Sequence, residues 1–127
     1  MGSKEVRLVL LFSGAMQSTA LVNPTAALSH RQRLGRCYEL SGLVALHNPH
    51  VTLVHGSIQG FNFPRIAHAW VELPDGSVWE PVTNKVWHRP IFDGFYRAQV
   101  TVKYDHQAMC RLCAQHEHWG PWNTVAA

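Results

Sequence analysis

The sequence "RIAHAWVELPDGSVWEPV", residues 65–82, decides how this chain is interpreted. A run of strand-forming residues ends at Leu73, a Pro-Asp-Gly sequence follows, and a second run covers residues 77–82. Such turn residues between two runs predict an antiparallel β-hairpin. The hairpin carries His68 near the start of one strand and Glu80 near the end of the next. Counted from the turn, these two residues lie within diagonal reach across the strands, given a bulge or a wider loop.

Further elements are predicted on both sides of the hairpin. Residues 51–60 and 95–105 have β-branched or alternating apolar residues, which are typical of strands. Helical composition precedes and follows them, at residues 14–22, 24–34, 37–47 and 106–118, while residues 6–12 could form a short strand or open a helix. This order predicts an α+β fold, with N-terminal helices packed on an antiparallel β-sheet and a short helix at the end.

The composition is that of one globular domain covering residues 1–127. Hydrophobic residues make up 46% of the chain and charged residues 15%, which is unlike a disordered chain. The net charge is +3, and the only dense basic patch is residues 31–36. We interpret that patch as a solvated helix end or loop and expect no nucleic-acid partner, because nucleic-acid surfaces carry longer basic stripes.

The cysteines and the N-terminus favour a cytoplasmic protein. The three cysteines are an odd number, which is unlike a secreted disulfide scaffold. Near the N-terminus, Glu5 lies within the basic region, and Ser13 and Gly14 interrupt the short apolar run, unlike a signal peptide. No run approaches the length of a membrane span. We therefore expect a soluble, cytoplasmic protein with no membrane partner.

Cys37, His68 and Glu80 appear in the order nucleophile, base and orienting residue. Cys37 is predicted to open a helix, whose positive end stabilises a thiolate. An imidazole can then take the thiol proton, and a third group on its other nitrogen fixes the ring. Each residue also has a structural interpretation: a buried cysteine, a sheet histidine and a solvated carboxylate. Their joint occurrence in this order favours a thiol enzyme.

This arrangement resembles the transglutaminase-like members of the papain-like cysteine enzyme superfamily. The resemblance covers roughly residues 32–104 and is carried by "RCYE" at Cys37, "HAWVE" at His68 and "VWEPV" at Glu80. It implies a papain/transglutaminase-like core and an enzyme that acts on amide or acyl groups through a covalent thioester. The family usually has Asp, or Asn, where this chain has Glu80, so Asn84, Asp75 and Asp93 are alternatives for the third role.

The resemblance also suggests residues around the reacting atoms. Gln32 is a candidate oxyanion donor beside the backbone N–H of Cys37, and Gln17 is a weaker one. Trp70 and Trp79 either pack in the core or bind substrate at the cleft. We expect hydrolysis of a peptide or isopeptide amide, with acyl transfer as the alternative, a protein or peptide as the substrate, and no metal or organic cofactor.

A second cluster offers a different function. Cys110, Cys113, His116 and His118 follow a C-x2-C-x2-H-x-H pattern, and thiolates and imidazoles are zinc ligands. The spacing is compact for a zinc finger, and on one helix the four side chains would not share a face. The structural interpretation is core cysteines with surface histidines. The alternative function is a non-catalytic binding module of the same fold, possibly with this cluster as a zinc site.

Overall fold

The predicted hairpin is present in the computed structural model, which describes residues 20–122. Strand β2 (Arg65–Glu72) pairs antiparallel with β3 (Val78–Glu80). In the turn, the Gly76 N–H donates to the Leu73 carbonyl at 2.9 Å, and Asp75 accepts from the Ser77 N–H at 2.9 Å. Gly76 has a φ of 90°, a conformation that glycine adopts without steric cost. These turn residues thus determine the position at which β2 and β3 begin to pair.

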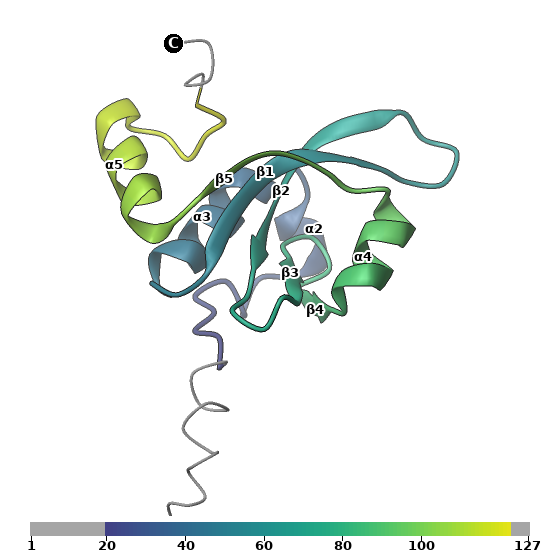
Figure 1. The fold of residues 1–127 in the computed structure, drawn as a ribbon, viewed down its shortest axis with the longest axis horizontal. Coiled ribbons are helices and arrows are strands. Elements are labelled where there is room, and N and C mark those ends of the chain that lie inside the picture. The colour runs from purple at the N-terminus through teal and green to yellow at the C-terminus, as the bar shows by residue number, and fades with distance from the viewer. Residues whose placement is uncertain (1–19, 123–127) are drawn as a thin grey trace, which may run out of the picture.

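The hairpin is part of a five-stranded antiparallel sheet with the order β4-β3-β2-β1-β5 (Figure 1). Its remaining strands are β1 (Thr52–Gln59), β4 (Lys85–Trp87) and β5 (Gln99–Tyr104). The connected ends of β1 and β2 project beyond the rest of the sheet (Figure 1). At the register shift between β1 and β5, a Cβ on Gly56 would lie 2.0 Å from the Gln99 carbonyl oxygen. Only glycine permits this close approach of the two strands.

Helices cover both faces of the sheet. Helices α3 (Cys37–Leu46) and α5 (His106–His116) contribute to one core cluster, and α4 (Arg89–Tyr96) contributes to the other. Successive strand residues point to opposite faces, so Val71 joins the α3 and α5 side whereas Trp70 packs with Phe92 of α4. The α+β class with an antiparallel sheet is therefore confirmed.

Two segments differ from the prediction. Residues 24–34 do not form one helix: a turn is followed by the short α2 (His30–Arg33), which begins after Ser29. The Ser29 side chain accepts from the Gln32 N–H, and the Gln32 side chain accepts from the Ser29 N–H, so a capping box starts the helix there.

The second difference is at residues 95–105, where one strand was predicted. Helix α4 runs to Tyr96, and Arg97 then takes a left-handed conformation with a φ of 49° before β5 begins. Pro90 suits the first turn of this helix, because it lacks the N–H that would have no acceptor there. Apolar residues alternate through Tyr96 and Ala98, so the sequence pattern does not show where α4 ends and β5 begins.

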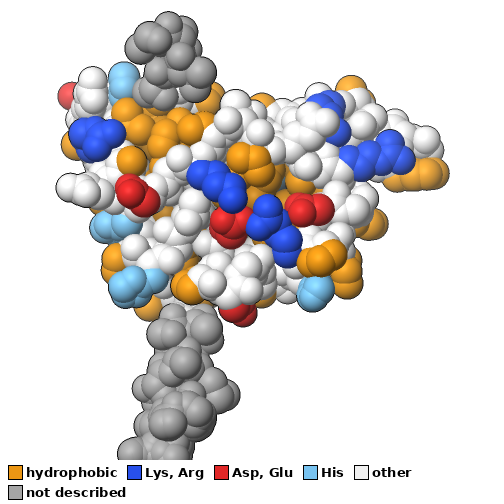
Figure 2. Space-filling model, in the orientation of Figure 1, with side chains coloured by type: hydrophobic (Ala, Val, Ile, Leu, Met, Phe, Trp, Pro, Cys, Tyr) orange, Lys and Arg blue, Asp and Glu red, His pale blue; other side chains and the backbone are white. Residues whose placement is uncertain are grey.

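The predictions for residues 6–12, for Gln17 and for residues 14–19 lie outside the described residues, and residues 20–22 of the helix predicted at 14–22 are not helical. Within residues 20–122, no helix has the length and apolar character needed to cross a membrane. On the face seen in Figure 2, basic and acidic side chains are interspersed and form no stripe of one sign. Three ion pairs among Glu72, Arg89, Asp93 and Lys103 illustrate this mixing.

Candidate active site

The structure brings His68 and Glu80 into direct contact. His68 Nε2 lies 2.7 Å from Glu80 Oε2, and both side chains are almost fully buried. The β2–β3 register pairs Val71 with Trp79, so His68 and Glu80 are a diagonal pair on one side of the hairpin. A short contact between a ring nitrogen and a carboxylate oxygen fixes the direction of the imidazole.

Glu80 is held as a carboxylate by donors from its own turn. Its Oε2 also accepts from the Val82 N–H at 3.1 Å, and its Oε1 accepts from the Thr83 N–H at 2.6 Å. Burial raises the pKa of Glu80, but the hydrogen bonds from His68, Thr83 and Val82 outweigh it and lower the pKa below its ordinary value. The orienting group is therefore ionised and rigidly placed.

Cys37 is the first residue of α3 and is partly exposed. Gly35, with a φ of 75°, redirects the chain just before the helix. Arg36 makes no side-chain cap and instead pairs with Glu39 through an Nε–Oε1 contact of 2.9 Å. The first N–H groups of a helix have no intrahelical acceptor, so the sulfur lies at the positive end of the α3 dipole.

His68 connects Cys37 with Glu80. Burial lowers the pKa of His68, but hydrogen bonding to Cys37 and Glu80 and the charges of both groups raise it to about 9. Since Nε2 contacts Glu80, Nδ1 is the ring nitrogen available to Cys37. The imidazole is therefore protonated near neutral pH. The geometry thus pairs the candidate base with its carboxylate, and Cys37 is among the causes of the raised pKa of His68.

Arg33 joins the two segments that carry Cys37 and Glu80, and sequence reasoning missed it. Its side chain is 2% exposed, although residues 31–36 were interpreted as solvated. The guanidinium donates to the Pro81 carbonyl at 3.1 Å and to the Leu28 carbonyl at 3.2 Å, and it also bonds Thr25. Nothing in the local pattern separates Arg33 from its exposed basic neighbours, and one of its partners, the Pro81 carbonyl, comes from a distant turn.

Among the other predicted site residues, the two tryptophans are core residues. Trp70 is 2% exposed and Trp79 is 1% exposed, so neither offers a ring face to a substrate. Of the two roles considered for them, packing in the core is the one that the structure shows, because both indoles complete the packing of the sheet faces. Gln32 is exposed, and its side-chain oxygen caps α2 rather than contacting Cys37.

The alternatives to Glu80 have other partners. Asp75 accepts from Ser77 in the hairpin turn. Asn84 accepts from Trp79 Nε1 at 3.1 Å and from Asn23 Nδ2 at 2.8 Å. Asp93 pairs with Arg89. Of these carboxylates and amides, Glu80 is the one that contacts His68.

The C-terminal cluster does not converge on a metal site. Within residues 20–122, no three His, Cys, Asp or Glu side chains come together as ligands. Cys110 lies 3.8 Å from the ring nitrogens of His106, and Cys113 lies 3.8 Å from Met109 Sδ. The described side chains of this cluster therefore offer no set of three metal ligands in this arrangement.

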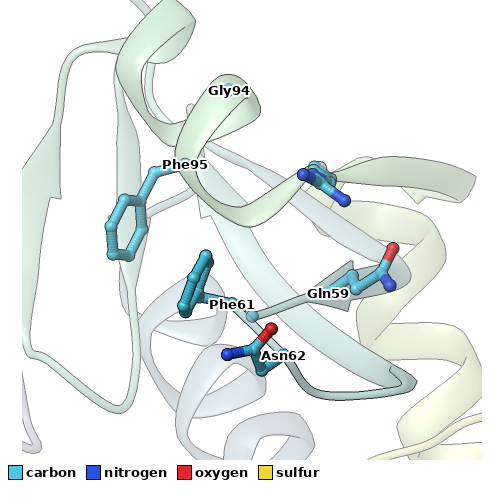
Figure 3. Close-up of a pocket in the computed structure, with 7 residues that line it drawn as sticks. Gln59, Phe61, Asn62, Gly94 and Phe95 are labelled. Atoms are coloured by element: carbon cyan, nitrogen blue, oxygen red, sulfur yellow. The ribbon is translucent and has the colours of Figure 1, made fainter.

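Two hollows lie beside the sheet. One of about 470 Å³ is lined by Tyr38 and Ala67, the chain neighbours of Cys37 and His68. The other, about 430 Å³, lies between the β1–β2 tip and α4, with Phe61 and Phe95 at its mouth (Figure 3). Neither is lined by Cys37 or His68, and Ala67 and His68 are successive β2 residues that point to opposite faces of the sheet.

Comparisons with protein-family models, with curated proteins and with solved structures find no match for this chain. The candidate site therefore rests on the geometry described above.

Proposed function

We propose that this protein is a thiol-dependent hydrolase with a papain/transglutaminase-like core, acting on a peptide or isopeptide amide, with acyl transfer as the alternative outcome. Cys37 is the nucleophile, His68 the general base and acid, and Glu80 the residue that positions His68. The observation that carries the proposal is the His68 imidazole, held by Glu80 at 2.7 Å on one nitrogen and interacting with Cys37.

The residues account for each proton in the reaction. The Cys37 thiolate attacks the carbonyl carbon, and the imidazolium of His68 gives its proton to the leaving amine as the C–N bond breaks. This leaves a thioester and a neutral imidazole. His68 then takes a proton from water, the resulting hydroxide attacks the thioester, and the acid is released with regeneration of the thiolate and imidazolium. If an amine replaces water, the same steps give a new amide.

The negative oxygen of the tetrahedral intermediate needs donors near Cys37. The N–H groups in the first turn of α3 have no intrahelical acceptor and point along the helix dipole. The backbone N–H of Cys37 is therefore the proposed principal donor. Gln32 could join it only if its side chain left the Ser29 N–H that it now accepts from.

Alkylation by iodoacetamide, located by mass spectrometry from pH 5 to 9, tests this proposal. We expect Cys37 to react rapidly near pH 6, because the thiolate is the reactive form. His68→Ala should slow this labelling by about tenfold or more, since it removes the neighbouring cation. Glu80→Gln should slow it less, because the imidazole remains.

Two cysteines in the same chain provide internal controls. Cys110 contacts His106, a histidine that pairs with no carboxylate in the described hydrogen bonds, and burial raises the pKa of Cys113. Both should label slowly near pH 6, and His68→Ala should leave their rates unchanged. Labelling of Cys37 at the rate of Cys110, with no effect of His68→Ala, would contradict the proposal.

A further inference from the structure

The hollow between the β1–β2 tip and α4 is a concave surface that the proposed thiol reaction does not use. Its volume is about 430 Å³, which is within the range of pockets that bind small ligands. Phe61 and Phe95 lie next to each other at its mouth (Figure 3). Phe61 is 85% exposed and Phe95 is 64% exposed. Two aromatic rings that water reaches on a concave surface indicate a binding site for an aromatic group.

The polar groups of the hollow suit a ligand with a negative charge. Within the described residues, Arg97 is the one charged residue that lines it, and Gln59 and Asn62 add two side-chain amides. Arg97 takes part in none of the ion pairs found in residues 20–122. The acid of α4, Asp93, pairs with Arg89 instead. The Arg97 guanidinium is therefore available to a carboxylate, which it can bind through two parallel hydrogen bonds.

Gly94 leaves space in the wall of this hollow. It lies inside α4, and its φ is not positive, so the helix backbone does not require glycine there. A glycine in a helix interior is less favourable than an alanine. A Cβ at this position would have no other atom of the described residues within 4 Å. Packing within the described chain therefore gives no reason for the glycine, and its effect is to keep room for a ligand.

The lining also limits which groups a ligand can carry. No Asp or Glu from the described part of the chain lines the hollow, so an ammonium group would gain no counter-ion and would be repelled by Arg97. An amide N–H, in contrast, can donate to the side-chain carbonyl of Gln59 or Asn62. The ligand therefore combines an aromatic ring, a carboxylate and an acylated amine. The carboxyl-terminal residue of a peptide carries all three on one carbon atom when its side chain is aromatic.

We propose that this hollow binds the carboxyl-terminal aromatic residue of a peptide chain. The ring packs on Phe61 and Phe95, in offset or edge-on contacts. The carboxylate pairs with Arg97, and the last amide N–H of the peptide donates to Gln59 or Asn62.

Titrations followed by nuclear magnetic resonance of the backbone amides test this site. The probe is N-acetyl-phenylalanine, which has the ring, the carboxylate and the acylated amine. N-acetyl-phenylalaninamide lacks the charge, N-acetyl-alanine lacks the ring, and phenylalanine itself has the ammonium group. We expect N-acetyl-phenylalanine to shift the Gly94 and Arg97 amide signals saturably, with a Kd of about 1 mM for a ligand of this size. Each of the other three probes should bind about tenfold more weakly, or without saturation.

Three variants locate the binding energy. Arg97→Gln removes the charge and should weaken N-acetyl-phenylalanine by about tenfold, to the affinity of the uncharged amide. Arg65→Gln is the matched control, because Arg65 pairs with Gln59 at the same end of the sheet but does not line the hollow. It should change the Kd by less than about twofold. Gly94→Ala places a methyl group in the hollow and should weaken the probe, while the urea midpoint of unfolding rises because alanine is the better helix former.

Four outcomes would overturn the inference. N-acetyl-phenylalaninamide that binds as tightly as N-acetyl-phenylalanine would remove the role of the carboxylate. Equal weakening in Arg65→Gln and Arg97→Gln would leave only a general effect of charge. Tighter binding of adenosine monophosphate, another anionic aromatic probe, would indicate a nucleotide site instead. Shifts of the same amide signals with protein concentration alone would show that a second copy of this chain covers the hollow.

This site and the proposed thiol reaction are tested separately. Neither Cys37 nor His68 lines the hollow, so the Kd of the probe and the rate of Cys37 alkylation report on different groups. If the probe fails to bind while Cys37 labels rapidly near pH 6, the peptide site is wrong and the reaction stands. If the probe binds while Cys37 labels as an ordinary thiol, the reaction is wrong and the peptide site stands.

Discussion

His68 and His55 lie on adjacent strands, are both 4% exposed, and have pKa values that are shifted in opposite directions. Burial lowers the pKa of both rings, and for His55 it is the cause of the fall to about 4. For His68 the interactions with Cys37 and Glu80 overcome burial and raise the pKa to about 9. The difference lies in their partners, because the two side chains are equally shielded from water.

The comparison separates a charged site from a neutral one within a single sheet. His68 meets a carboxylate that the hairpin presents from the next strand. His55 meets the rings of Tyr38, Tyr104 and Trp122, and its Nε2 has no partner. The first environment suits proton transfer, and the second keeps an imidazole neutral at pH 7.

The same substitution at both histidines should give very different stabilities. His68→Phe leaves the buried Glu80 carboxylate without its partner and should lower the free energy of unfolding by about 3–5 kcal/mol. His55→Phe removes an unpaired nitrogen and keeps the aromatic packing, so it should change stability by less than about 1 kcal/mol. Urea denaturation at pH 7 measures both. Equal losses would show that His68 and Glu80 are not a coupled pair.

Arg33→Met tests whether Arg33 holds the His68–Glu80 site in position. The variant removes a buried guanidinium that bonds Thr25, Leu28 and Pro81, and it should cost about 2–3 kcal/mol of unfolding free energy. Arg31→Met, at an exposed position in the same basic patch, is the matched control and should be neutral to within about 0.5 kcal/mol. Cys37 labelling near pH 6 should slow in Arg33→Met alone. If Arg33→Met leaves the free energy of unfolding unchanged, Arg33 does not hold the site in position.

The pH dependence of stability should separate the two histidines. The folded pKa of His55 is below its ordinary 6.5, so its contribution is complete above pH 6.5 and is lost as the pH falls toward 4. The folded pKa of His68 is raised, so its contribution is complete below pH 6.5 and is lost as the pH rises through about 9.

His55→Phe should therefore flatten the loss of stability between pH 6.5 and 4.5, by up to about 1.4 kcal/mol per pH unit. Its behaviour above pH 7 should match that of the parent protein. Chemical denaturation at half-unit pH steps makes the comparison. An unchanged slope in the acid range would mean that His55 is not buried as a neutral ring.

The sequence was sufficient to predict the hairpin and the helix that begins with Cys37. Asp75 and Gly76 define the turn, and counting from it placed His68 and Glu80 within diagonal reach, given a bulge or a wider loop. The α+β class followed from the order of the elements. These features depend on local chemistry, which the sequence shows directly.

The missed features depend on contacts between distant segments. The end of helix α4 lay in a segment whose alternation is typical of a strand, and no element was predicted for the rest of α4 or for the short β4. The burial of Arg33 requires the Pro81 carbonyl, and the neutral environment of His55 requires Trp122, far along the chain. Trp70 and Trp79 could have been core or cleft residues, and only the packing of the two sheet faces distinguishes these possibilities.

Titration of the His68 imidazole by nuclear magnetic resonance tests the central claim most directly. The claim is that Cys37, His68 and Glu80 form one chain of interacting groups. It predicts that His68 titrates with a pKa of about 9, and that Cys37→Ala and Glu80→Gln each lower this pKa. A His68 pKa near 6.5 that neither variant changes would contradict the account.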